Sequence, residues 1–388
     1  MKQKIIRITT VPISLEKLLS GQLQFMSSFY DVIAVSSEKE NLERLGKKQG
    51  LDIFPLEMTR KITPIKDALA VIKLYFFLKK TKPFIVHSHT PKAGIVGMLA
   101  AKLAGVPHRL HTVAGLPLLE AVGSKRKVLD TVEKFTYSCA TMVYPNSFGL
   151  KNIILDHNFC HSNKLKVLAN GSSNGIDTSF FNPELYSEEQ NSKLKNELGI
   201  QRDDFVFIFV GRLVKDKGIN EMVAAFERLQ KENTKVKLLL VGDYENDLDP
   251  LNPKTVESIN DNPSIIAAGF KNDVRPYLAV ANALVFPSYR EGFPNVVMQA
   301  GAMGLTSIVS NINGCNEIII EKENGLIIPV KDEMAILSAM KTVVANSSLT
   351  TKMKENSRKM IVSRYEQKVV WEAILSEYRT FDPDFKLE

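Results

Sequence analysis

Short apolar runs alternate along the chain with segments in which apolar residues recur every three or four positions. In the first half, strand-like runs lie at residues 4–11, 31–37, 83–89, around 108–113 and at 142–147. Helical segments are expected at 92–106 and from about 124 to 140. From Val206 the pattern restarts, with strand-like runs at 206–211, 237–242, 264–269, 283–288 and 307–310. This alternation predicts an α/β fold with two Rossmann-like, doubly wound parallel sheets.

A polar, turn-rich stretch separates the two series of strands. It runs from Asn182 to Lys193 (NPELYSEEQNSK) and is interpreted as a linker. We therefore expect an N-terminal domain over residues 1–185 and a C-terminal domain over residues 190–365, facing each other across a crevice. With 388 residues, the chain is long enough for two domains that each bury a core.

The stretch from Arg290 to Gly304 (REGFPNVVMQAGAMG) has the features of a ligand-binding loop. It follows the strand-like run 281–288 and leads into a helix expected over 296–303, with Asn295 as its N-cap. Ligands bind at the carboxyl ends of strands in open α/β sheets, and free N–H groups at a helix start favour a phosphate. Glu291 therefore lies in a loop placed for ligand binding, and Asn295 is assigned to the phosphate.

A second loop of this kind lies upstream, from Gly211 to Gly218 (GRLVKDKG). It follows the apolar run 204–210 and precedes a helical pattern over Ile219–Glu232. A guanidinium at Arg212 and an ammonium at Lys217 could clamp a diphosphate, although no GxxxxGK[ST] phosphate loop is present. Together, the two loops describe a cleft for a nucleoside diphosphate.

The motifs GRLVKDKG and PSYREGFPNVVMQAGAMG resemble the donor-binding half of family 4 glycosyltransferases, which have the GT-B fold. The resemblance extends over essentially the whole chain. It implies that Arg212 and Lys217 contact the diphosphate of a nucleotide-sugar donor and that Glu291 holds hydroxyls of the donor sugar. It also implies that the last helix, at 366–388, packs back on the N-terminal domain.

The resemblance assigns further residues to the donor. Phe293 and Pro294 are placed in the donor-sugar site. The family's ribose-binding glutamate is replaced here by Gln299, which loses the charge-assisted strength of a carboxylate. Gly21 matches a glycine whose bare backbone lets the donor approach. The base-binding turn of the family is matched by Gly269, Phe270 and Lys271.

Two histidines end the strand-like run 83–89. Alternation sends them to different sides, so that His89 is best placed at the cleft whereas His87 is expected to pack or cap a loop. In family 4 the residue matching His89 approaches the donor phosphate or the transferred sugar, so His89 and Glu291 are the predicted catalytic residues. Many relatives have a histidine where this chain has Ala114, and His111 is the candidate for its role on the acceptor side.

Neither loop contains a DxD motif or a group of histidines and carboxylates, so we expect no metal and no other cofactor. Arg212, Lys217 and the helix start near Asn295 would then neutralise the phosphate charge. Family 4 enzymes retain the anomeric configuration. The resemblance therefore implies a front-face displacement in which the leaving diphosphate helps to take the proton of the acceptor.

The two halves of the chain differ in charge. Residues 1–185 carry 25 Lys and Arg against 14 Asp and Glu, whereas the remainder carries 25 against 29. This difference predicts an acidic partner for the first domain. No nucleic-acid module and no alternation of basic with aromatic residues is present, so an anionic membrane surface is favoured over nucleic acid.

Two clusters carry much of this positive charge. One surrounds the apolar segment 68–78, and the other consists of Lys125, Arg126 and Lys127. A polybasic, partly apolar face can hold a protein at anionic lipid. A core helix with a solvated basic rim accounts for the same pattern equally well. The lysines of the first cluster are Lys61, Lys66, Lys73, Lys79, Lys80 and Lys82.

Targeting and cysteine patterns are typical of a soluble cytosolic protein. The apolar stretch near the N-terminus is too short for a signal peptide, and no run reaches the length of a membrane span. The three cysteines have neither metal-binding nor disulfide spacing.

These inferences predict a retaining, metal-independent glycosyltransferase with a nucleotide-sugar donor, expected to be UDP-linked. It would extend a lipid-linked saccharide in capsule, O-antigen or lipopolysaccharide assembly, as a peripheral protein at the inner face of a bacterial cytoplasmic membrane. Two alternatives remain, a sugar-nucleotide epimerase of the GT-B type and a non-catalytic module that binds lipid or nucleic acid.

Overall fold

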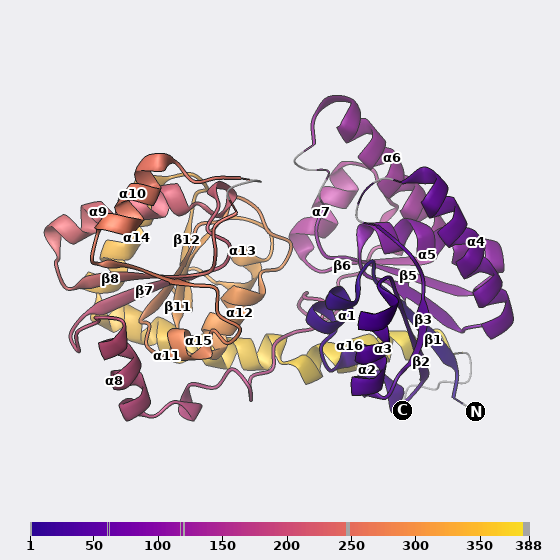
Figure 1. Ribbon diagram of the computed structural model, residues 1–388, viewed down its shortest axis with the longest axis horizontal. Helices are drawn as coiled ribbons and strands as arrows, with labels where there is room; N and C mark the ends of the chain where they lie inside the picture. Colours follow the sequence, from indigo (N-terminus) through magenta and orange to yellow (C-terminus); the bar gives the residue numbers. More distant parts are fainter. Residues whose placement is uncertain are drawn as a thin grey trace. The chain divides into compact units, whose positions relative to one another are not determined.

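The computed structural model of the chain describes residues 2–59, 61, 63–116, 118, 121–245 and 249–382. The chain forms two compact units (Figure 1). The N-terminal unit extends to Asn174 and resumes at Lys368, and the C-terminal unit is Gly175–Gln367. Each contains a six-stranded parallel sheet with helices on both faces, so the predicted doubly wound α/β architecture is confirmed.

The sheet of the N-terminal unit has the strand order β3-β2-β1-β4-β5-β6. Its strands are β1 (Lys4–Ile8), β2 (Asp31–Ser36), β3 (Asp52–Pro55), β4 (Ile85–Ser88), β5 (His108–Val113) and β6 (Met142–Pro145). Its helices are α1 (Pro12–Leu18), α2 (Gln22–Ser27), α3 (Lys39–Gln49), α4 (Pro64–Thr81), α5 (Pro91–Ala104), α6 (Gly123–Cys139), α7 (Phe148–Asp156) and α16 (Gln367–Arg379).

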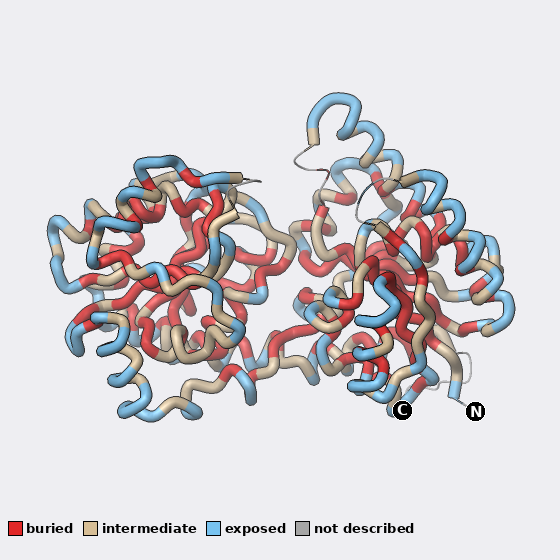
Figure 2. The backbone as a smooth tube through the Cα atoms, viewed as in Figure 1, coloured by how far each residue is buried: buried red, intermediate tan, exposed pale blue. Residues whose placement is uncertain are grey.

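Alternation along the strands builds a separate core on each face of this sheet. Ile6 and Ile8 of β1 pack with α4, α5 and α7, whereas Ile5 packs on the other face with α1, α2, α3 and α16. Figure 2 shows buried residues following the strands of the sheet. Helix α16 therefore supplies part of the core of the N-terminal unit, through residues such as Ile374 and Tyr378. Residues 383–388 of the predicted C-terminal helix lie outside the described part.

The sheet of the C-terminal unit has the order β12-β11-β10-β7-β8-β9. Residues 206–209 of its strand β7 are fully buried, as expected for a central parallel strand covered on both faces. The strands are β7 (Phe205–Val210), β8 (Val236–Val241), β9 (Ile265–Gly269), β10 (Ala283–Phe286), β11 (Thr306–Ser310) and β12 (Gly325–Ile328). The helices are α8 (Glu188–Glu197), α9 (Ile219–Glu232), α10 (Pro253–Asp261), α11 (Arg275–Ala279), α12 (Asn295–Ala302), α13 (Cys315–Ile318), α14 (Glu333–Ala345) and α15 (Ser347–Tyr365).

The boundary between the units falls earlier than the expected linker at 182–193. Phe181 belongs to the core of the C-terminal unit, and Arg358 of α15 donates hydrogen bonds to the carbonyls of Thr178 and Phe181, at 2.9 and 2.8 Å. The polar stretch that follows starts a helix, because Ser187 caps α8 in a capping box. The turn-forming residues therefore mark a helix start inside the C-terminal unit, and the domain limits at 185 and 190 are corrected to Asn174 and Gly175.

Helix α4 has features of both interpretations of the apolar segment 68–78, a core helix and an exposed apolar surface. It buries Ala70, Leu74 and Leu78 in the core, but a second apolar stripe on the helix faces solvent. The members of this stripe recur at helical spacing and are Ile65, Leu69, Ile72 and Phe76. Among the described residues, no helix is long and apolar enough to cross a bilayer.

Candidate active site

The strand order of the C-terminal sheet creates a switch point at its carboxyl edge. Strands β7 and β10 are neighbours, and the chain leaves them in opposite directions, toward β8 after β7 and toward β11 after β10. Loops on the two sides of such a point diverge and leave a crevice, which is where α/β sheets bind ligands. The loop 211–218 singled out from the sequence lies at this point, and so does the loop 287–294, which contains the first part of the predicted stretch 290–304.

Lys217 and Glu291 meet at the switch point. The Lys217 Nζ lies 2.6 Å from Glu291 Oε1, and the two side chains are only 14% and 19% exposed. Ser288 Oγ donates to the same carboxylate oxygen at 3.0 Å. The backbone N–H of Tyr289 donates to the Asp216 carbonyl at 2.8 Å and ties the two loops together. The structure therefore brings together a cation expected at the phosphate and a carboxylate expected at the sugar.

Gly218 allows the first loop to approach the second this closely. Its φ of +70° is in the left-handed region, and a Cβ at this position would lie 2.2 Å from the Pro287 carbonyl oxygen. Only glycine satisfies both the backbone conformation and the close approach. Lys217, the preceding residue, is thereby held beside the end of β10.

Arg212 lies at the same edge but contacts another residue. Its Nη1 lies 2.5 Å from Glu245 Oε2, and its side chain is 49% exposed. Among the described residues, its ion pair is thus with the loop after β8 and not with Glu291. A guanidinium at this position can still turn toward a phosphate, because an exposed ion pair of this kind is weak.

Helix α12 begins one residue earlier than its expected cap implies. Pro294 is the N-cap and Asn295 the first helical residue, with no side-chain capping bond, so Asn295 is not the N-cap. Pro294 has an extended backbone and ends the loop, so the helix begins at the next residue, Asn295. The first N–H groups of α12 consequently lack an intrahelical acceptor and suit an anion.

The other residues expected around the donor sugar and ribose lie near this helix. The Phe293 side chain is buried and packs against Tyr365 at a ring separation of 5.4 Å, and Pro294 is buried as well. Their side chains are therefore core groups, and the backbone is the part available to a ligand. Gln299 is half-buried on α12.

The predicted base-binding turn follows β9. Asp243, at the end of β8, accepts a hydrogen bond from the Phe270 N–H at 3.0 Å, and Gly269 has a φ of +70°. The Phe270 side chain is exposed, and Lys271 Nζ lies 5.5 Å from the Tyr277 ring centre. The turn lies at the same edge of the sheet as the loops after β7 and β8.

Three further residues of the site were not expected from the sequence. Ser288 orients Glu291, and Arg290 ties the loops through an ion pair with Asp216 at 2.8 Å. The position of Ser288 at the end of an apolar run is the signal that points to it. Cys315 is buried nearby, and burial together with the Glu291 carboxylate raises the pKa of its thiol well above the usual range. The thiol therefore stays protonated and is no nucleophile.

The N-terminal sheet has its own switch point between β1 and β4, since α1 and α5 lie on opposite faces. His89 follows β4 at this point. Its side chain is 3% exposed, and its Nε2 accepts a hydrogen bond from Nε of Arg7 at 3.0 Å. Burial first, then His87, Arg7 and His111, hold the pKa of His89 well below its usual range, so the ring is neutral.

His87 and His111, the other two histidines considered from the sequence, are packing groups in the structure. His87 is held between the hydroxyls of Tyr378 and Thr112, at 2.5 and 2.7 Å, as expected. His111 Nδ1 lies 2.8 Å from Ser88 Oγ, its ring is 3% exposed, and burial lowers its pKa to about 4. An acceptor could touch His111 only after the ring is uncovered.

Gly21 is the N-cap of α2 and has a φ of +74°. A Cβ at this position would lie 2.6 Å from the Trp371 ring, so the indole of α16 occupies the space next to this glycine. The structure thus gives Gly21 a packing role with Trp371. Among the described residues, no group of three or more His, Cys, Asp or Glu side chains is arranged to hold a metal ion.

The two sheets and their switch points define the class of fold. HepE of Anabaena, crystallised in complex with UDP, superposes with a TM-score of 0.81 at 17% identity, over 98% of this chain and 100% of that one. Two Rossmann-like domains of this kind form the GT-B fold.

Sequence comparison then gives the family. Residues 190–360 match the profile "Glycosyl transferases group 1", and residues 18–147 match "Glycosyl transferase 4-like". The chain is 34% identical to the capsular polysaccharide biosynthesis glycosyltransferase CapM of Staphylococcus aureus, over 98% of this chain and 97% of CapM. It is 31% identical to the Escherichia coli UDP-Gal:alpha-D-GlcNAc-diphosphoundecaprenol alpha-1,3-galactosyltransferase, over 94% and 95% of the two chains. The protein belongs to the family 4-type glycosyltransferases of surface-polysaccharide synthesis, and the non-catalytic alternative is set aside.

Proposed function

We propose that this glycosyltransferase moves a sugar from a UDP-linked donor to a lipid-linked saccharide, with retention of configuration and without a divalent metal. The observation that carries the proposal is the contact between Lys217 and Glu291 at the switch point. A cation for the phosphates and a carboxylate for the sugar lie side by side, as a bond between sugar and phosphate requires.

In the proposed reaction, the bond from the anomeric carbon to the diphosphate oxygen breaks and the acceptor oxygen forms a bond on the same face. The acceptor's proton passes to an oxygen of the leaving diphosphate. Lys217, Arg212 and the first N–H groups of α12 stabilise the negative charge that develops on this diphosphate. Glu291, held by Ser288, accepts hydrogen bonds from sugar hydroxyls and stabilises developing positive charge. A metal ion is not needed where these groups supply the charge.

UDP is favoured as the nucleotide by the relatives. The name of the Escherichia coli relative contains UDP-Gal, and HepE was crystallised with UDP. In this chain the uracil would lie at the turn formed by Gly269, Phe270 and Lys271 and contact its backbone groups. Gln299 would hold the ribose through one accepted and one donated hydrogen bond.

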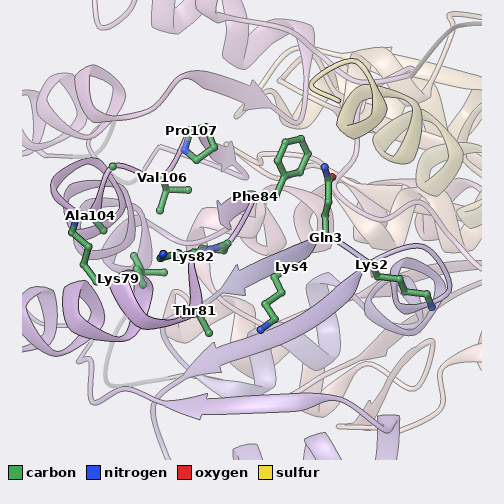
Figure 3. A pocket seen from close by; sticks show the side chains of 13 residues that line it. Lys2, Gln3, Lys4, Lys79, Thr81, Lys82, Phe84, Ala104, Val106 and Pro107 are labelled. Atoms are coloured by element: carbon green, nitrogen blue, oxygen red, sulfur yellow. The ribbon is translucent and has the colours of Figure 1, made fainter. Parts of the chain in front are cut away.

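An acceptor carried by a membrane lipid agrees with the surface of the N-terminal unit. The solvent-facing apolar stripe of α4 (Ile65, Leu69, Ile72 and Phe76) is accompanied by exposed lysines of the same helix, Lys66, Lys73 and Lys80. A hollow of about 690 Å³ lies at the amino ends of β1, β4 and β5, and four further lysines line it (Figure 3). These are Lys2, Lys4, Lys79 and Lys82.

We propose that these groups hold the enzyme at the inner face of an anionic bilayer. The apolar stripe would enter the interface while the lysines contact lipid phosphates. The diphosphoundecaprenol acceptor in the name of the Escherichia coli relative supports this location.

UDP is expected to raise the thermal stability of the full chain more than GDP, ADP or dTDP does. At a hundred times its Kd, a ligand adds about 2.7 kcal/mol to the free energy of unfolding. For units of this size, that corresponds to a rise in Tm of roughly 5 to 10 °C. Differential scanning fluorimetry with each nucleotide measures the shift.

Lys217→Ala tests whether UDP binds at the proposed site, because this variant should lose most of the rise in Tm that UDP produces. A larger shift with another nucleotide would contradict a UDP donor, and an unchanged shift in Lys217→Ala would contradict the site. Incubation with UDP-N-acetylglucosamine alone tests the epimerase alternative, since only an epimerase converts this nucleotide sugar without an acceptor.

The triple variant Lys66→Ala/Lys73→Ala/Lys80→Ala should bind anionic vesicles more weakly. Each lysine near an anionic surface contributes about 1 kcal/mol, so the loss over three is roughly 100-fold. Flotation with vesicles that contain phosphatidylglycerol measures it. Lys231→Ala/Lys254→Ala/Lys359→Ala removes the same charge from exposed sites of the C-terminal unit and should bind as the wild type does. Equal wild-type binding to phosphatidylcholine alone would overturn the proposed surface.

A further inference from the structure

Arg7 and His89 form a buried contact between neighbouring strands of the N-terminal sheet. Arg7 lies on β1 and is fully buried, and its Nε donates to His89 Nε2 at 3.0 Å. An arginine Nε always carries a hydrogen and never accepts. The His89 Nε2 must therefore provide its lone pair to this bond.

The consequence concerns the other ring nitrogen. A neutral imidazole has one protonated and one unprotonated nitrogen, so the hydrogen of His89 lies on Nδ1. The groups that face this ring from the neighbouring elements are Arg7 of β1, His87 of β4 and His111 of β5, and none of them is acidic. Positive and neutral neighbours together with burial keep the ring uncharged at neutral pH.

Two of the hydrogen-bond donors in this contact have no partner within the described residues. His89 Nδ1 and Arg7 Nη1 are both buried and unbonded. Buried donors left unpaired are costly, so natural proteins seldom leave them without an acceptor. His89 also immediately precedes Thr90, the N-cap of α5, whose free amide groups favour negative charge.

The orientation of Arg7 is itself held by a chain of hydrogen bonds. Its Nη2 donates to Gln22 Oε1, and the Gln22 amide donates to Asn174 Oδ1 at 3.0 Å. Asn174 Oδ1 also accepts from Trp371 Nε1 at 2.7 Å. Three residues from distant parts of the sequence thus hold one guanidinium.

We propose that Arg7 is a positioning residue that fixes His89 as an Nδ1–H donor for an oxygen of the nucleotide sugar, either a phosphate oxygen or a sugar hydroxyl. Like the ring of His111, the buried ring of His89 must be uncovered before this contact can form. His89 then acts only as a hydrogen-bond donor and is no general base, because its single lone pair is engaged by Arg7. The proton of the acceptor must go elsewhere, which agrees with its transfer to the leaving diphosphate. The reactive role of His89 rests on the proposed function, whereas its tautomer does not.

Nitrogen NMR of the full chain labelled at its six histidines tests the tautomer directly. The His89 signal is assigned by its loss in His89→Asn. At pH 7 we expect an unprotonated Nε2 and a protonated Nδ1. In Arg7→Met, which cannot donate, Nε2 should become protonated. A protonated Nε2 in the wild-type protein would overturn the proposal, without any assay of transfer and even if Arg7→Met failed to fold.

Kinetic measurements test whether the Nδ1–H of His89 contacts the nucleotide sugar during transfer. The asparagine amide of His89→Asn can take the place of Nδ1–H, whereas the glutamine amide of His89→Gln reaches the position of Nε2. We expect kcat to fall less than about 10-fold in His89→Asn and about 100-fold in His89→Gln and Arg7→Met. Arg7→Lys, which still donates, should retain the tautomer and part of the activity.

If kcat fell equally in His89→Asn and His89→Gln while the tautomer was as expected, the proposed contact of the Nδ1–H with the nucleotide sugar would be wrong. The proposed transferase activity would not be contradicted by this outcome. If the wild-type protein transferred no sugar from any UDP-sugar, the proposed function would fail, and the NMR result would still decide the role of Arg7.

Discussion

Glu291→Gln is expected to lower kcat by about 100- to 1,000-fold, because a neutral amide cannot stabilise positive charge on the sugar as a carboxylate does. The side-chain volume is unchanged, and the amide oxygen can still accept the hydrogen bond from Ser288. UDP binding should change little, since the phosphates contact Lys217 and not Glu291 in the proposed complex. Steady-state transfer from a UDP-sugar and the UDP-induced shift in Tm measure the two effects.

Glu323→Gln is the matched control for this substitution. It neutralises a carboxylate of the same unit whose partner, Lys352, lies at 3.0 Å in an exposed ion pair. Exposed pairs contribute at most about 1 kcal/mol, so kcat should stay within twofold of wild type. Full activity in Glu291→Gln would remove the carboxylate from the mechanism.

Gly218→Ala is expected to abolish transfer and to destabilise the C-terminal unit by about 3 kcal/mol or more. A left-handed backbone already costs an alanine about 1 to 2 kcal/mol. The new methyl group would also lie 2.2 Å from the Pro287 carbonyl oxygen, so the two loops must separate. This separation would move Lys217 away from Glu291. Chemical denaturation and transfer assays measure the change.

Gly304→Ala is the control that separates the cost of backbone strain from the cost of a steric clash. Gly304 has a similar φ of +77°, but no atom lies within 4 Å of the Cβ position. We expect it to cost only about 1 to 2 kcal/mol and to leave kcat unchanged. If both alanine variants behaved alike, the close approach of the two loops would not be what positions Lys217.

The ion pair of Lys217 and Glu291 links the residues proposed for the sugar and for the phosphate. Each residue belongs to a different loop, and Asp216 links these loops through both its backbone carbonyl and its carboxylate. A displacement of either loop would therefore disturb both halves of the proposed donor site together. This explains why a substitution at Gly218, which carries no reactive group, is expected to be as damaging as one at Glu291.

Much of the fold follows from local patterns. Strands β7 to β11 and the helix Ile219–Glu232 lie where the apolar runs and spacing predict them. Strands β3 and β12, each at the edge of its sheet, were not expected, because four residues are too few to give a clear pattern. In β3, three of these residues are also only half-buried. The polar residues before α8 were interpreted as a linker because a helix cap and a turn use the same residue types.

The apolar runs determined by themselves that the chain has an α/β fold, and the glycines and charged residues of two loops predicted a phosphate site at one edge of its second sheet. These signals are local, and the carboxyl edge of a parallel sheet necessarily gathers the loops that follow its strands. Only the tertiary structure decided which side chains meet there. It paired Lys217 with Glu291, turned Arg212 toward Glu245, and placed Arg7 against His89. Such pairings depend on strand order and register, which join residues far apart in sequence and leave no trace in the neighbourhood of either one.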